Sequence, residues 1–124
     1  MSSRPFLKPF TIFSATSTGT SLTQSPPTII NQLPLVSFSM SWTGTTTGTF
    51  SVEASDDYSI NPDGTVKNAG TWNSLPFSTT VAAVGSQGHG MYDVFGCGAY
   101  ALRLVFTRSA GTGSLTAIVT GKVL

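Results

Sequence analysis

The residues of this chain that could do chemistry are few. Three carboxylates, Asp56, Asp57 and Asp63, fall in one polar segment and offer the hard oxygen ligands that Ca²⁺ prefers. Their spacing does not match an EF-hand loop, and aspartates in loops commonly order turns through hydrogen bonds to nearby backbone. We therefore expect these side chains to order turns, with a type I turn at residues 61–64 (NPDG), and we expect no metal site.

Residues for nucleophilic or acid–base catalysis are equally scarce. Cys97 and His89 are the single cysteine and histidine, and a thiol–imidazole pair needs a third group that orients the base. Cys97 lies in the sequence FGCG, which favours a small buried residue. Glu53 has Arg103 as a candidate cross-strand partner rather than a second glycosidase carboxylate. We expect no enzymatic activity and no cofactor, and a small hydrolase is our last-ranked hypothesis.

Aromatic side chains supply another candidate site. Carbohydrate-binding modules with a sandwich fold stack sugars on exposed rings, and Tyr58, Trp72 and Tyr92 could form such a platform here. Trp42 and Tyr100 instead alternate in phase with aliphatic residues, so we expect them in the core. Glycan binding is therefore an alternative hypothesis, which requires an exposed Trp72.

The elements that must position these residues have the period of two that is typical of β-strands. Residues 35–43 (LVSFSMSWT) alternate apolar residues with serine, and residues 49–55 (TFSVEAS) show the same pattern after a GTTTG turn. Because one face of each segment is apolar, we expect two half-buried strands. The short turn between them predicts a β-hairpin.

A second pair of strands is expected in residues 98–121, around a glycine-rich turn at 109–113. The alternation places one set of side chains on the core face and Arg103 on the opposite face. Leu115, Ala117 and Val119 resume the pattern after the turn. We expect a second β-hairpin here, with core residues Tyr100, Leu102, Leu104 and Phe106.

Composition favours the same fold class. The chain has 124 residues, of which 40% are hydrophobic and 9% are charged, whereas about 25% is typical of soluble domains. Serine, threonine and glycine replace the charged residues that normally solvate helices. Short strands separated by turn signals at intervals of roughly 8–12 residues predict an all-β protein with one antiparallel, jelly-roll-like β-sandwich.

The N-terminal region differs from the rest because prolines interrupt it. We expect residues 1–34 to form an extended arm with one or two short edge strands, and residues 35–124 to form the sandwich core. Such arms add strands to the sheet edge of a neighbour, although simple disorder is the alternative. The expected assembly contacts are Phe6, Phe10, Phe13 and Arg103.

Charge and hydropathy exclude several classes of partner. The net charge is +1 and the six cationic residues are scattered, so we expect no nucleic-acid binding. No segment approaches the roughly 20 apolar residues of a membrane span, and no secretory leader is evident. A nearly neutral surface suits a subunit that packs against other subunits.

Three segments, SWTGTTTGTFSVEASDDY, GTWNSLPF and YALRLVFTRSAGTGSLTAIVTGK, together resemble small β-sandwich virion proteins of tailed bacteriophages. Those proteins tend to show a W-x-G turn, a strand ending in S-x-D/N, a W-x-x-L segment, and an R-x-x-[YF]-T strand followed by a G-x-G hairpin. The resemblance covers residues 35–122. The matching residues are Trp42, Gly44, Ser55, Asp57, Trp72, Leu75, Arg103, Phe106, Thr107, Gly111 and Gly113.

The resemblance implies a non-enzymatic structural protein of a bacteriophage virion, of the capsid-decoration, head-fibre or tail-associated type. It implies synthesis in the cytoplasm of a bacterial host and assembly into the virion. The partners it implies are further copies of the chain, with a trimer favoured, and other virion proteins. The alternative is the carbohydrate-binding module described above.

Overall fold

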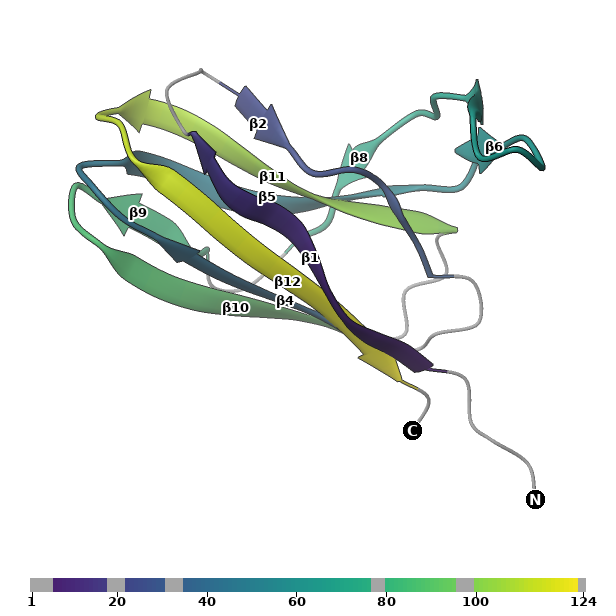
Figure 1. Cartoon of the computed structure of the whole chain (residues 1–124), viewed down its shortest axis with the longest axis horizontal. Helices are drawn as coiled ribbons and strands as arrows, with labels where there is room; N and C mark the ends of the chain where they lie inside the picture. The colour runs from purple at the N-terminus through teal and green to yellow at the C-terminus, as the bar shows by residue number, and fades with distance from the viewer. Residues whose placement is uncertain (1–5, 18–21, 31–34, 77–79, 96–99, 123–124) are drawn as a thin grey trace.

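The structure, a computed structural model, describes residues 6–17, 22–30, 35–76, 80–95 and 100–122. These residues form a β-sandwich of two antiparallel sheets (Figure 1), which confirms the predicted fold class. No helix long and apolar enough to cross a membrane is found in these ranges. Sheet A contains, in spatial order, β1 (Phe6–Ser17), β12 (Ser114–Lys122), β4 (Leu35–Trp42) and β10 (Gly88–Phe95).

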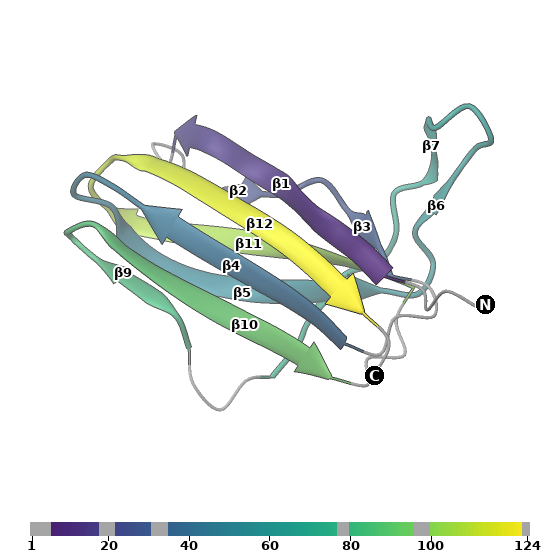
Figure 2. The same ribbon diagram turned by 60° about the horizontal axis from the view of Figure 1, so that its bottom comes forward.

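Sheet B faces sheet A across the core, and a small third ladder projects from one end of the sandwich (Figures 1 and 2). Sheet B contains, in spatial order, β2 (Leu22–Gln24), β11 (Ala101–Ala110), β5 (Thr47–Ser55) and β8 (Asn73–Ser74). Two further short strands extend it, β3 (Thr28–Ile29) beside β11 and β9 (Ala82–Val84) beside β5. The projecting ladder contains β6 (Ser59–Ile60) and β7 (Val66–Asn68).

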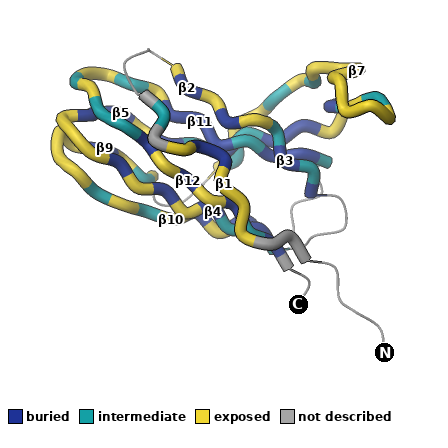
Figure 3. Tube along the Cα trace, viewed as in Figure 1, coloured by how far each residue is buried: buried dark blue, intermediate teal, exposed yellow. Residues whose placement is uncertain are grey.

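The core lies between the two sheets. Alternate side chains of the long strands fill it, and Figure 3 shows the buried residues near the middle of these strands. Trp42 of β4 packs on Phe50 of β5 with ring centroids 5.1 Å apart, and Phe50 packs on Phe106 of β11 at 4.7 Å. Leu102 and Leu104 are also fully buried, as predicted. Tyr100 is half-buried, so it borders the core instead of filling it.

The two predicted hairpins are wrong in one respect, because in each case the second strand lies in the other sheet. Strand β4 pairs with β10 and β12 in sheet A, whereas β5 pairs with β11, β8 and β9 in sheet B. Likewise β11 belongs to sheet B and β12 to sheet A. Each short connection is therefore an arch between sheets. An arch and a hairpin both place one apolar face on a core, so alternation cannot distinguish them.

The two arches lie side by side at the same end of the sandwich (Figure 1). The backbone N–H of Thr45 donates to the carbonyl oxygen of Thr112 at 2.9 Å, and the N–H of Thr43 donates to that of Ser114 at 3.0 Å. Gly111, with φ of +71°, lies so close that an added Cβ would overlap the carbonyl oxygen of Thr45. Glycine is therefore required for the arches to pack together.

Part of the expected N-terminal arm is built into the sandwich. Strand β1 pairs with β12 along its length, with register shifts on both sides of Phe13. One shift places Ile12 as an extra residue between paired positions, so both Ile12 and Phe13 turn into the core. Without the bulge, strict alternation would turn only one of these two side chains into the core.

The glycine-rich segment 85–90 contains the start of strand β10. Strand β10 already begins at Gly88, where the backbone pairs with Trp42 of β4. A Cβ on Gly88 would lie 2.8 Å from Cζ2 of Trp42, so the missing side chain leaves room for the indole. This packing allows the ladder between β4 and β10 to extend to Gly88.

Replacing Gly111 with alanine should destabilise the sandwich more than the same change at Gly64, although both glycines have positive φ. At Gly64 the new Cβ meets nothing within 4 Å, so we expect a loss of about 1–2 kcal/mol from the left-handed backbone alone. At Gly111 the overlap with Thr45 should bring the loss to at least about 3 kcal/mol. Urea unfolding followed by circular dichroism measures both losses, and equal values would contradict the packed arches.

Candidate functional site

The outer surface of sheet B carries an ion pair between its two central strands. Arg103 of β11 and Glu53 of β5 are cross-strand partners. The guanidinium Nε–H donates to Oε1 of Glu53 at 2.7 Å, and Nη2 lies 2.7 Å from the same oxygen. The predicted pair is confirmed. The two side chains are only 18% and 20% exposed, so water screens this pair less than it screens a fully exposed one.

Trp72 covers this ion pair. It immediately precedes β8, which pairs with β5 and so brings the indole over the outer surface of sheet B. The centroid of its ring lies 4.3 Å from Cζ of Arg103, and its indole N–H donates to the carbonyl oxygen of Ala69 at 2.9 Å. The ring of Tyr58 lies 5.8 Å away at an angle of 51°. We call the four residues Glu53, Arg103, Trp72 and Tyr58 the Trp72 cluster.

Asp57 closes the base of the loop between β5 and β8. Its carboxylate accepts hydrogen bonds from the backbone N–H of Thr71 at 2.6 Å and from the hydroxyl of Ser55 at 2.8 Å. These two donors, Thr71 foremost, lower the pKa of Asp57 below its ordinary value of 3.8. Ser55 in turn accepts the N–H of Tyr58 at 3.1 Å. The carboxylate therefore fixes both ends of the loop that carries Trp72.

Asp63 orders the turn at the tip of the same loop. The N–H of Gly64 donates to the carbonyl oxygen of Asn61 at 2.9 Å, which confirms the predicted turn. The hydroxyl and the N–H of Thr65 both donate to Asp63, at 2.6 and 3.0 Å, and they lower the pKa of this carboxyl. In the part of the chain that the structure describes, no three histidine, cysteine or acidic residues come together to bind a metal.

Two of the three aromatic residues considered for glycan contact are buried. Tyr92 is 4% exposed; its hydroxyl donates to the carbonyl oxygen of Phe50 at 2.8 Å and accepts the N–H of Val81 at 2.8 Å. Tyr92 therefore ties sheet A to sheet B, a role that its alternation did not reveal. Tyr58 is 8% exposed and belongs to the Trp72 cluster. Neither ring can present a face to a sugar, which corrects that expectation.

Trp72 is half-buried, and the guanidinium of Arg103 occupies one side of its ring. The sequence did not predict this contact, because the two residues are far apart in the chain and belong to different elements. Trp72 is surrounded in the sequence by polar loop residues, and nothing in that pattern indicates Arg103 as its partner. The three aromatic residues therefore do not form a common exposed platform.

The phenylalanines expected as assembly contacts have different positions. Phe10 is 53% exposed at the edge of sheet A, so it is available to a partner. Phe13 is 4% exposed and packs in the chain's own core, which corrects its expected role as an exposed anchor. The backbone of Phe6 begins β1, and its side chain lies outside the described residues.

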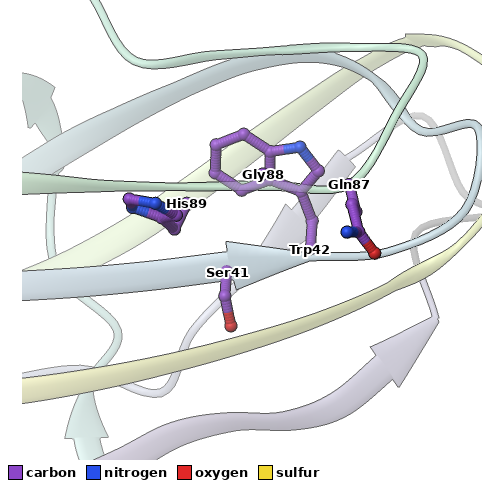
Figure 4. Close-up of a pocket in the computed structure, with 5 residues that line it drawn as sticks. All are labelled: Ser41, Trp42, Gln87, Gly88 and His89. Carbon is purple, nitrogen blue, oxygen red and sulfur yellow. The ribbon is translucent and has the colours of Figure 1, made fainter.

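A shallow, open pocket of about 550 Å³ lies at one end of sheet A (Figure 4). The indole of Trp42 lies against Gly88, with Gln87 and His89 on either side, and Ser41 completes the lining. The indole N–H donates to the carbonyl oxygen of Ser86 at 3.1 Å. His89 is the one titratable side chain in the lining, so the pocket lacks an acid–base pair. Cys97, its considered partner, lies outside the described residues.

The outer surface of sheet A is polar but carries few charges. Strands β10, β4 and β12 contribute three rows of facing residues. Met91 and Ile118 are exposed apolar residues, at 56% and 39%, on either side of Ser39 in the middle row. We call this surface the sheet A outer face; it contains His89, Met91, Asp93, Ser37, Ser39, Ser41, Thr116, Ile118 and Thr120.

Comparison with solved structures shows that this fold is similar to that of a prophage-derived protein. The SPBc2 prophage-derived protein YomS aligns with 97% of this chain and 96% of its own length, with a TM-score of 0.51 and 12% sequence identity. A carbohydrate-binding module of the CBM4 type aligns with 81% of this chain and 61% of its own length, with a TM-score of 0.45 and 12% identity. No protein-family model and no curated protein matches the sequence. The likeness to YomS establishes a shared fold.

A double-mutant cycle should detect the contacts of the Trp72 cluster. We expect Glu53→Gln and Arg103→Met to show a coupling free energy of about 1 kcal/mol, because the pair is partly buried. Arg103→Met combined with Trp72→Leu should show about 0.5–1 kcal/mol, because the guanidinium loses the aromatic ring. Urea unfolding gives all six free energies. Additive losses in both cycles would contradict the cluster.

The stability of the loop should fall in acid because Asp57 holds its proton less tightly in the folded chain than in the unfolded chain. Its contribution is fully present above the ordinary value of 3.8 and is lost as the pH falls through the lower folded pKa. Tryptophan fluorescence during urea titrations from pH 6 to about pH 2 should report this loss.

The Asp57→Asn variant should lose less stability over the same acid range than the wild type. Asp56→Asn is the matched control, since Asp56 is its exposed neighbour in the same loop. This control should retain the acid dependence of the wild type. An Asp57→Asn variant with an unchanged acid dependence would show that the carboxylate does not anchor the loop.

Proposed function

We propose that this protein is a non-enzymatic structural subunit of a bacteriophage virion, which packs as a homo-oligomer against other virion proteins. The observation that carries the proposal is the sheet A outer face, where serine and threonine surround exposed Met91 and Ile118. Asp93 is the one carboxylate among its nine residues. A polar surface with few charges costs less to desolvate than a charged one when another subunit covers it.

Two further observations support a packing role. The chain shares its fold with a prophage-derived protein over nearly the whole length of both chains. The polar clusters that the structure describes also serve the fold itself, since Asp57 and Asp63 order their own loop and Arg103 pairs with Glu53. These four charged side chains are therefore used in internal contacts.

The geometry favours packing over glycan binding for the aromatic residues. Stacking on a sugar requires an exposed ring face. Tyr58 and Tyr92 are buried, and Arg103 stacks on Trp72. A glycan array that remained silent for the wild type would agree with this conclusion. Selective binding that is lost in Trp72→Ala would favour a carbohydrate-binding module instead.

Particle association tests the proposed function directly. An antibody raised against the chain should detect it in virions purified on a density gradient from lysed producer cells. We expect several copies per particle, because structural subunits repeat around a symmetry axis. Quantitative mass spectrometry of the same fractions would give the copy number and separate a shell position from a tail position. A chain that stays at the top of the gradient would contradict the proposal.

A further inference from the structure

Strand β10 is the least protected sheet edge in the described part of the chain. It borders sheet A opposite β1 (Figure 2) and pairs with β4 over eight residues without a register shift. Strand β1, on the other border, contains Pro9 and several register shifts. The border strands of sheet B are only two or three residues long. Because a long regular edge readily accepts another strand, β10 is better suited to strand addition than the other described edges.

The two faces of β10 differ in exposure. Its core side is occupied by this chain, because Tyr92 and Val94 are buried and a Cβ on Gly90 would lie 2.5 Å from Cγ1 of Val81. On its other side, His89, Met91 and Asp93 are exposed. A docking strand would therefore meet a row of histidine, methionine and aspartate along the outer face.

We propose that β10 pairs in antiparallel orientation with β10 of a second copy of this chain, about a twofold axis at Met91. This pairing joins the two copies of sheet A into one continuous sheet, the self-complementary arrangement of a twofold dimer. Met91 then faces its own copy at the axis. His89 faces Asp93 of the second copy, and the same pair recurs on the other side of the axis.

Complementarity between an imidazole N–H donor and a carboxylate acceptor selects this register. A twofold axis at Asp93 would place two carboxylates opposite each other, and an axis at Tyr92 would place Met91 opposite a carboxylate. Only the axis at Met91 brings the imidazole of His89 opposite a carboxylate, and opposite partners across strands stabilise a pairing. On the core side, glycines then face the larger residues of the second copy, which avoids steric overlap.

The inference deepens the proposed function and rests on its homo-oligomer part, since it names the surface through which copies meet. Light scattering of the full chain after size exclusion should give the mass of a dimer, or of a larger assembly with an even number of copies. A wild-type monomer at all concentrations, or a trimer, would overturn the edge pairing. Virion association is measured separately, so the structural role could stand while the edge pairing fails.

The decisive variant is Met91→Lys, which places two ammonium groups against each other at the axis. It should raise the dissociation constant of the dimer by at least about tenfold. Ile118→Lys is the matched control, because it adds the same charge to the sheet A outer face but away from the edge. Equal losses in both variants would indicate packing through that face, and they would overturn the edge pairing.

A charge exchange tests the register. His89→Asp places two carboxylates opposite each other and should weaken the dimer by at least about tenfold. Adding Asp93→His to the same chain restores an opposed pair and should recover most of the wild-type affinity. These side chains are exposed, so circular dichroism should show all variants folded. Failure of the double variant to recover affinity while His89→Asp weakens it would overturn the register at Met91.

Discussion

The packing of two arches against each other is the constraint on which the rest of this sandwich depends. The chain crosses between the sheets from β4 to β5 and again from β11 to β12, and both crossings lie at the same end. Backbone hydrogen bonds from Thr43 and Thr45 to the second arch hold them together. Gly111 allows this approach because it carries no Cβ. The close packing of the two arches therefore depends on backbone contact.

The arches also determine which side chains meet in the core and on the surface. Because β5 and β11 lie side by side in sheet B, Phe50 packs on Phe106 inside, while Glu53 pairs with Arg103 outside. Tyr92 then bridges from sheet A to the carbonyl oxygen of Phe50. The Trp72 cluster completes the outer surface of sheet B. Its polar groups bind one another, so this surface contributes to stability.

Sheet A has the opposite character, and it carries the exposed surfaces that we propose for contacts with partners. Its outer face is lined by serine and threonine around Met91 and Ile118, and its β10 border is long and regular. Desolvating such a surface costs less than desolvating a charged one. In the described residues the ion pair of Glu53 with Arg103 lies on sheet B, whereas the sheet A outer face has few charges and is the surface that we propose for subunit contacts.

The sequence by itself determined the all-β class, the core residues of β4, β5 and β11, the turn at Asn61–Gly64 and the pairing of Glu53 with Arg103. These features depend on local alternation and on turn-forming residues, both of which can be recognised in residues that are neighbours in the sequence. Only the tertiary structure decided that the two expected hairpins are arches, that Phe13 and Tyr92 are internal, and that Trp72 stacks on Arg103. Each of these depends on contacts between distant segments. An alternating pattern shows which face of a strand is buried, but it does not show which sheet the strand joins or which sheet covers it.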